Sequence, residues 1–275
     1  MMMNNSHWKL TLAQPQEVLC SLHNHSTYSD GKHTLREMAQ HAKNAGCRLF
    51  GISDHYTRHP EVGDTFWSTK FSQLPGYFAD LAELKSELDD ENFTLLSGLE
   101  VDYFTENWSQ VKADIEDFPI DYLIGSVHYV GDFALDNSQE DYDGITPETL
   151  KFLWQENFRK LTEAAATGDF LFLGHADLLK KFVGVPDREY LNYARTMLEA
   201  CQESGTAIEL NTSGWRKPCA SAYPEPEILA MAKEYGVPVV ITADAHLRSH
   251  IGEDFTRARA LLENSGITPS ILRKQ

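Results

Sequence analysis

The stretch SLHNHSTYSDGKHT, residues 21–34, carries two histidines two positions apart and a nearby carboxylate. His23 and His25 would point to the same side of an extended chain, so both imidazoles could reach one cation. Asp30 follows five residues later, and the preceding apolar residues EVLCSL predict a strand that leads into the pair. Because a single histidine after a strand is more often a hydrogen-bonded structural residue, a metal site requires support from elsewhere in the chain.

That support comes from the ends of seven short apolar runs, which cover residues 17–23, 48–53, 93–99, 121–127, 170–174, 206–210 and 237–242. Their lengths suit buried strands. A histidine or a carboxylate closely follows six of the seven runs, and the residues concerned are His23, His25, Asp54, His55, Glu100, His128, His175, Asp177, Asp244 and His246. Burying so many of these groups would cost on the order of several kcal/mol for each unpaired charge, and metal ions would remove that cost.

The segments between the runs have helical periodicity and are expected to form helices over 75–90, 107–116, 148–167, 187–204, 225–236 and 253–265. An earlier helix is predicted to begin after Thr34, with Glu37 completing a capping box, and to stop at Gly46. Strands that alternate with helices predict an α/β fold, and the lack of a dinucleotide-binding glycine motif favours a barrel. In such a barrel the carboxyl ends of the strands carry the chemistry.

Composition narrows the classes of function. The 275-residue chain has a formal net charge of −17, which disfavours nucleic acid, and no apolar run is long enough for a membrane span. The four cysteines form no C-x-x-C pair, and together with the polar start MMMNNSHWKL they predict a reduced, cytoplasmic protein. No linker divides the chain, so we expect one domain over 1–275, with a disordered or loosely packed segment at 1–10.

The ligand types point to particular metals. Imidazoles and carboxylates without thiolates suit Zn, Mn or Fe. The six histidines at the ends of the runs, together with Glu100, Asp244 and Asp30, make nine candidate ligands. This number exceeds what one ion needs, so two or three divalent ions are expected.

The motif series HNHSTYSDG, ISDH, GLE, GSVH, GHAD and TADAH resembles the polymerase and histidinol phosphatase (PHP) family of metal-dependent phosphoesterases, in order from residue 23 to 246. The resemblance implies a distorted seven-stranded (β/α)7 barrel, similar to a TIM barrel, with a trinuclear metal site. The implied ligands are His23, His25, Glu100 and Asp244 for the first ion, Glu100, His128 and His175 for the second, and Asp30, His55 and His246 for the third.

Chain length and the segment NTSGWRK resemble the histidinol-phosphatase branch of that family. This implies hydrolysis of L-histidinol phosphate to L-histidinol and phosphate in histidine biosynthesis, with a bridging water activated for in-line attack. Arg216 is the predicted catalytic clamp on the phosphate, because a guanidinium can bind phosphate in a bidentate manner. Lys181 and His55 are further candidates for phosphate binding.

Other residues have supporting roles in this prediction. Glu100, Asp244 and His246 are assigned to catalysis, and either of the last two could protonate the leaving alkoxide. Asp54 and Asp177 are expected to orient ligating imidazoles. The acidic residues that could pair with a substrate amine are Asp102 and Glu106, and the aromatic residues that could pack on a substrate ring are Phe66 and Trp67.

Three alternatives remain open from the residues alone. The chain could hydrolyse another phosphomonoester, such as a nucleotide, phosphotyrosine or a sugar phosphate. It could be a metal-binding module without catalysis, or a hydrolase of carbon–nitrogen bonds, since amidohydrolase barrels also begin with H-x-H. The expected partner is a small phosphomonoester, and the expected assembly is a monomer or small homo-oligomer. The histidines assigned to no site are His7, His33, His41, His59 and His250.

Overall fold

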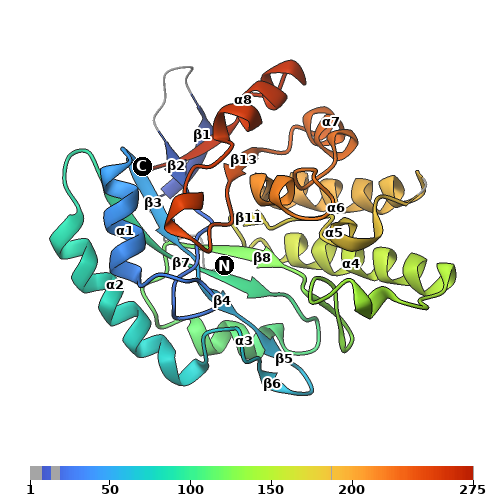
Figure 1. Cartoon of the computed structure of the whole chain (residues 1–275), viewed down its shortest axis with the longest axis horizontal. Helices are drawn as coiled ribbons and strands as arrows, with labels where there is room; N and C mark the ends of the chain where they lie inside the picture. Colours follow the sequence, from blue (N-terminus) through green and yellow to red (C-terminus); the bar gives the residue numbers. More distant parts are fainter. Residues whose placement is uncertain (1–7, 14–18, 187, 275) are drawn as a thin grey trace.

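The computed structural model describes residues 8–13, 19–186 and 188–274. A parallel sheet lies at its centre (Figure 1). Its seven main strands are β2 (Cys20–Ser21), β3 (Leu49–Ile52), β7 (Thr94–Asp102), β8 (Tyr122–Ser126), β11 (Phe172–Leu173), β12 (Ala207–Asn211) and β13 (Val239–Thr242). Their spatial order is β13-β12-β11-β8-β7-β3-β2, so each of the seven apolar runs supplies one strand.

The two edges of the sheet approach each other, so that the barrel is nearly closed. Beyond β2 and β13, the N–H of His25 donates to the carbonyl of Ala245 at 2.9 Å. The N–H of Ala245 donates in turn to the carbonyl of His23 at 3.1 Å. The pair of histidines therefore lies on the closing segment itself, and the predicted seven-stranded barrel is confirmed.

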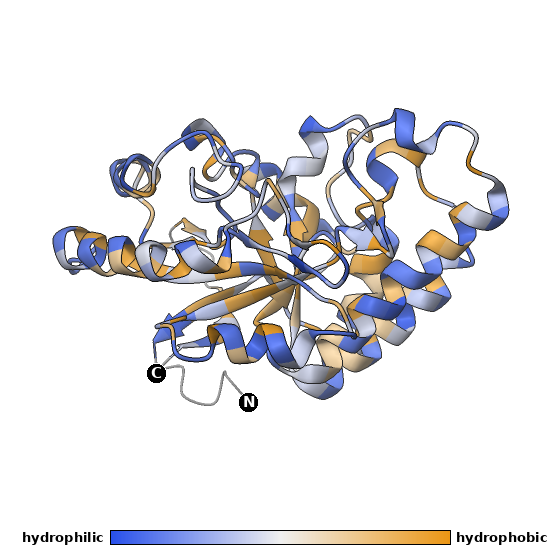
Figure 2. Ribbon diagram, turned by 90° about the horizontal axis from the view of Figure 1, so that it is seen from below, coloured by the Kyte–Doolittle hydropathy of each residue, from blue (hydrophilic) through white to orange (hydrophobic). Residues whose placement is uncertain are grey.

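The helices cover the outside of the sheet, and in Figure 2 the strands are mainly hydrophobic while the helices alternate between the two colours. They are α1 (Leu35–Asn44), α2 (Leu74–Leu88), α3 (Trp108–Ile115), α4 (Pro147–Thr167), α5 (Lys180–Val183), α6 (Tyr190–Ser204), α7 (Pro226–Tyr235) and α8 (Phe255–Asn264). The predicted capping box is present at α1, where Thr34 and Glu37 each bond to the backbone of the other. Short 3-10 turns occur at η2 (Phe71–Gln73), η3 (Glu140–Tyr142), η4 (Thr212–Arg216) and η5 (Arg248–His250).

Apolar side chains fill the interior of the barrel, except at its carboxyl end, where the residues are polar. Tyr122 of β8 crosses this interior and donates its hydroxyl to the carbonyl of Leu22. Gly51 and Gly98 make room for the ring, because a Cβ atom at either position would lie within 2.4 Å of Tyr122. Close packing of this interior fixes the positions of the strands next to the polar carboxyl end of the barrel.

Short elements surround this frame. They are β1 (Trp8–Leu12) paired with β14 (Ser270–Lys274), β4 (His55–Tyr56) beside β7, the hairpin of β5 (Arg58–His59) with β6 (Gly63–Asp64), and the hairpin of β9 (Tyr129–Val130) with β10 (Phe133–Ala134). Of the segment 1–10, which was expected to be disordered or loosely packed, residues 8–10 lie in β1, and residues 1–7, with His7, lie outside the described residues. No helix in the described ranges is both long and apolar enough to cross a membrane.

Candidate metal centre

The nine predicted ligands lie together at the carboxyl end of the barrel. Glu100, near the end of β7, is at their centre, and its side chain is fully buried. Its Oε2 atom lies 3.0 Å from His23 Nε2 and 2.9 Å from His55 Nδ1. Its Oε1 atom lies 3.0 Å from His175 Nε2 and 3.8 Å from His128 Nε2. One carboxylate thus contacts imidazoles from four different segments of the chain.

Two further carboxylates complete the cluster on its more open side. Asp244 Oδ1 lies 3.2 Å from His25 Nε2, and Asp244 adopts a left-handed backbone conformation with φ of 48°. Asp30 Oδ2 lies 3.1 Å from His246 Nε2. The side chains of Asp30 and His246 are 35% and 28% exposed, so the cluster opens toward solvent at this edge.

The spacing of the donor atoms agrees with several adjacent cations. Three groups bring their nitrogen and oxygen atoms within 4.8 Å of one another: His25 with Asp30, His55 and His246; His23 with His25 and Glu100; and His55 with Glu100 and His128. The set assigned to a third ion thus falls within one group. His25 and His55 each belong to two groups, so the structure does not divide the ligands as cleanly as the motifs imply.

Unsatisfied donor and acceptor atoms provide a test of whether these residues fit a cation. Among the described residues, no hydrogen bond is made by His23 Nε2, His25 Nε2, Asp30 Oδ1 or Glu100 Oε2, all of which are buried. Buried polar atoms without partners are rare in folded proteins and destabilise them. Lone pairs of imidazole and carboxylate that face one another are the donors that Zn, Mn and Fe bind, so the residues fit a metal centre.

Charge in the cluster is organised around its carboxylates. Burial opposes ionisation of Glu100, but the imidazoles of His23 and His55 hold its pKa well below its usual range. Burial, together with the imidazoles of His55 and His246, lowers the pKa of His25 to about 3. His25 is therefore neutral at pH 7 and has a lone pair free for a cation.

Two carboxylates contact the Nδ1 atoms of imidazoles in the cluster and so fix the orientation of the rings. Asp102 lies two residues after Glu100 on β7, hence on the same face of the strand, and its Oδ1 atom lies 3.0 Å from His128 Nδ1. Burial alone would lower the pKa of His128, but Asp102 raises it to about 10. Glu209 Oε2 lies 2.8 Å from His23 Nδ1. The interpretation of Asp102 as a partner for a substrate amine is therefore wrong.

Sequence reasoning missed Glu209, although one signal was present. It is a carboxylate inside the apolar run TAIEL, where a charged residue is unexpected unless it has buried partners.

The structure also differs from the prediction for Asp54 and Asp177. The backbone N–H of Ser26 donates to Asp54 Oδ1 at 2.7 Å, and the hydroxyl of Ser26 donates to Asp54 Oδ2. Asp54 therefore fixes the loop that follows the histidine pair. Asp177 pairs with Lys180 at 3.0 Å, and neither carboxylate bonds to an imidazole of the described residues.

A cavity of about 450 Å³ lies over the open edge of the cluster. Six of the nine predicted ligands line it: Asp30, His55, His128, His175, Asp244 and His246. Aromatic residues form part of the wall, and the indole N–H of Trp67 donates to the hydroxyl of Tyr129 at 3.2 Å. Phe66 also lines the cavity, and its side chain is 94% exposed.

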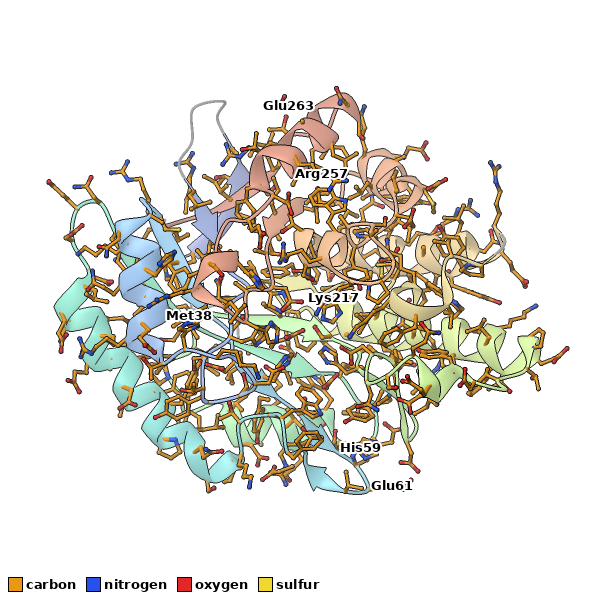
Figure 3. All side chains as sticks on the ribbon, in the orientation of Figure 1. Met38, His59, Glu61, Lys217, Arg257 and Glu263 are labelled. Carbon is orange, nitrogen blue, oxygen red and sulfur yellow. The ribbon has the colours of Figure 1, made fainter. Side chains whose placement is uncertain are left out.

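Arg216 does not line this cavity. Its Nη2 atom donates to the carbonyl of Ala243 at 2.8 Å, and its Nε atom lies 3.4 Å from Glu253 Oε2. The cationic side chains that line the cavity are Lys32, Lys181 and Lys217. In Figure 3, Lys217 lies near the middle of the view. Of the predicted phosphate-binding residues, Lys181 and His55 are thus in the cavity wall and Arg216 is not.

His59, which had no predicted role, joins the two hairpins beside the cavity. Its Nε2 atom lies 3.1 Å from the carbonyl of Gly131 in the β9–β10 turn. Its Nδ1 atom accepts the N–H of Glu61 at 3.3 Å, and the two residues lie together in Figure 3. Both ring nitrogens contact backbone, so His59 is a structural residue, as expected from the sequence.

Comparison with known proteins agrees with this geometry. A family model described as the PHP domain matches residues 21–213. The chain belongs to the PHP family. A "Probable histidinol-phosphatase" of Deinococcus radiodurans is 35% identical over 244 residues, which cover 87% of this chain and 91% of that protein. The "Histidinol-phosphatase" of Bacillus subtilis is 26% identical over 243 residues, which cover 80% of the PHP chain described here and 89% of the Bacillus protein.

A solved structure supports the same fold. The histidinol phosphate phosphatase of Lactococcus lactis, a complex with Zn, L-histidinol and phosphate, superposes with a TM-score of 0.77. It is 21% identical, and the match covers 90% of the PHP chain and 94% of the Lactococcus chain. At this identity the similarity concerns the fold, and the metal and ligands are those of the Lactococcus protein.

Proposed function

We propose that this PHP-family protein hydrolyses L-histidinol phosphate to L-histidinol and phosphate, with two or three divalent cations as cofactors. The observation that carries the proposal is the meeting of nine imidazole and carboxylate side chains beside one cavity. The identity of 35% to a probable histidinol-phosphatase, over most of both chains, supports the choice of substrate.

The residues of the cluster would hold the cations. Glu100 contacts imidazoles on both sides of the centre, so it is the candidate bridging ligand. Bound Zn, Mn or Fe would supply Lewis acidity and lower the pKa of a coordinated water. Asp102 and Glu209 keep His128 and His23 in a fixed orientation, which limits the reorganisation needed when a cation binds.

The wall of the cavity supplies the groups that a phosphomonoester needs. Lys32, Lys181 and Lys217 bring positive charge to the space beside the cluster, and the hydroxyl of Ser213 lines the same space. A phosphate dianion would be neutralised there by ammonium groups rather than by the guanidinium of Arg216. Asp244 and His246 both line the cavity, so either could pass a proton from a coordinated water to the leaving alkoxide.

The aromatic part of the wall favours an alcohol that carries a ring. Trp67 is fixed by its hydrogen bond to Tyr129, and the two rings stack with an interplanar angle of 13°. Phe66 at the rim offers an uncovered ring. A flat imidazole could pack against such a surface, because aromatic pairs gain about 0.5–1.5 kcal/mol beyond the burial of their area.

A panel assay tests the proposal. The metal-loaded protein is given L-histidinol phosphate, phosphotyrosine, a nucleoside monophosphate and a sugar phosphate, and the metal content of the same sample is measured. We expect kcat/KM for L-histidinol phosphate to exceed the others by about a hundredfold or more. A clear preference for another ester would assign a different substrate within the family. Failure on every ester with a full metal complement would leave a metal-binding module without catalysis.

A further inference from the structure

One carboxylate in the cavity wall does not belong to the metal cluster. Three carboxylates line the cavity: Asp30, Asp136 and Asp244. Asp30 and Asp244 each contact an imidazole of the cluster. Asp136 instead lies beside Lys181, whose Nζ atom is 3.2 Å from Asp136 Oδ2.

Asp136 is held in place by its backbone neighbours. Lys181 Nζ also donates to the carbonyl of Asp136 at 2.6 Å. The preceding residue, Leu135, is fully buried and donates its N–H to the carbonyl of His128 at 2.8 Å. The hydroxyl of Tyr142 donates to the carbonyl of Leu135 at 2.7 Å. Asp136 is thus fixed next to the segment that carries a ligand of the metal centre.

The carboxylate of Asp136 is charged and accessible. Burial opposes its ionisation, but the nearby His128 and Lys181 lower its pKa below the ordinary value. Its side chain is 37% exposed, and the Oδ1 atom accepts no hydrogen bond from the described residues. This oxygen can therefore accept a hydrogen bond from a ligand in the cavity.

We propose that Asp136 binds a protonated amine of the substrate and makes the enzyme selective for phosphomonoesters of amino alcohols. The inference rests on the proposed phosphomonoesterase function. In such an ester the ammonium group is only a few bonds from phosphorus, and the ester carries both charges of the Asp136–Lys181 pair. The phosphate would lie beside the ammonium of Lys181, and the substrate ammonium would donate to the free Oδ1 atom of Asp136.

The acidic residues that the sequence suggested for this role do not have the same position. Asp102 is 2% exposed and accepts from the backbone N–H of His128 and the hydroxyl of Thr57. Glu106 is not among the residues that line the cavity. Asp136 lies on the loop between β10 and η3, and no motif in the sequence singles it out.

Paired substrates separate recognition of the amine from catalysis. The metal-loaded protein is assayed with L-histidinol phosphate and with the analogue that lacks the amine, 3-(imidazol-4-yl)propyl phosphate. For the wild type we expect kcat/KM to favour the amine by about tenfold, as for one partly exposed charge-assisted hydrogen bond. Asp136→Asn should bring this ratio close to one, and Asp136→Glu should retain part of the preference. Asp143→Asn, an equal change at an exposed carboxylate of the same loop region, should keep the wild-type ratio.

Two results would overturn the inference: a wild type that does not distinguish the two esters, or an Asp136→Asn variant that keeps the wild-type ratio. A purely structural role for Asp136 would slow both esters equally and therefore gives the second result. If L-histidinol phosphate is not hydrolysed but another phosphomonoester is, the proposed substrate is wrong. The ratio of 2-aminoethyl phosphate to ethyl phosphate then tests Asp136 in the same way.

Discussion

Glu209 allows a prediction in which stability and metal binding can be measured separately. Its four hydrogen-bond partners all act as donors: His23 Nδ1 at 2.8 Å, Thr242 Oγ1 at 2.7 Å, the N–H of His175 at 2.6 Å and Asn211 Nδ2 at 2.8 Å. Each carboxylate oxygen accepts two of them. In Glu209→Gln, the new NH2 group can face the N–H of His175 and Asn211 Nδ2, and both of those hydrogen bonds are then lost. If it faces His23 and Thr242 instead, the hydroxyl of Thr242 can turn to accept, and only the bond from His23 in its present tautomer is lost.

The size of the effect follows from these contacts. Hydrogen bonds to a charged group contribute about 1.5–3 kcal/mol each, so one or two lost bonds cost about 1.5–6 kcal/mol of unfolding free energy. For a chain of this size the Tm should fall by about 4 °C or more. Because Glu209 also orients His23, the affinity for the first cation should fall by about 10- to 100-fold.

Thermal unfolding of the metal-free protein measures the first effect, and titration with Zn or Mn against a competing chelator measures the second. Glu203→Gln makes the same change on the exposed side of α6 and should alter neither quantity. Thr242→Val removes one donor without altering the carboxylate, so it should cost about 1.5–3 kcal/mol and leave metal affinity nearly unchanged. Wild-type unfolding and wild-type metal affinity in Glu209→Gln would refute the assigned role of this carboxylate.

The remaining predictions concern the centre and its cavity. Glu100→Gln should weaken a shared candidate ligand and lower kcat by about a hundredfold or more. The control His41→Ala, at an exposed position, should change kcat less than about twofold. Similar values of kcat in both variants would contradict a role for the cluster in catalysis. Lys217→Ala should raise KM about tenfold, because Lys217 lines the cavity. Arg216→Ala should change KM little but lower the Tm, because Arg216 bonds to the backbone. If steady-state kinetics instead show a raised KM for Arg216→Ala and an unchanged KM for Lys217→Ala, Arg216 is the phosphate clamp. In the metal-free protein the pKa of His128 is raised to about 10, above its unfolded value of about 6.5, so its contribution to stability is complete below pH 6.5 and is lost as the pH rises through 10. A cation must displace that proton, so affinity for Zn or Mn should rise between pH 7 and pH 9, and a flat titration series would show that His128 is not a ligand.

The fold could be predicted to a large extent because its strands are buried on both faces. Such strands appear as uninterrupted apolar runs, and each of the seven runs contains one strand of the barrel. Their bounds were less predictable: the run at 170–174 yields only the two-residue β11, since pairing stops where the chain turns toward His175. Strands of two residues, as in the β5–β6 and β9–β10 hairpins, are too short to have a measurable period.

The convergence of the candidate ligands could be predicted for a related reason, since strand order does not matter when every parallel strand ends at the same rim. Arg216 follows the end of a strand in sequence, but its side chain does not line the cavity. The 3-10 turn η4 after β12 carries its side chain toward Ala243 and Glu253, and the direction of a turn is not encoded in residue spacing. The same holds for Asp136, whose position depends on how the β9–β10 hairpin folds back over the cluster.

The net charge of −17 would seem to oppose a substrate that carries a phosphate. Surface charges, however, are screened beyond about 8–10 Å at physiological ionic strength, whereas charges that line a cavity act on a ligand at contact distance. The cavity contains Lys32, Lys181 and Lys217, and cations bound to the cluster would add further positive charge beside them. The local arrangement of charge thus decides which small anion can enter, whereas a high net negative charge disfavours the binding of long polyanions. A small phosphomonoester is therefore compatible with a strongly acidic protein.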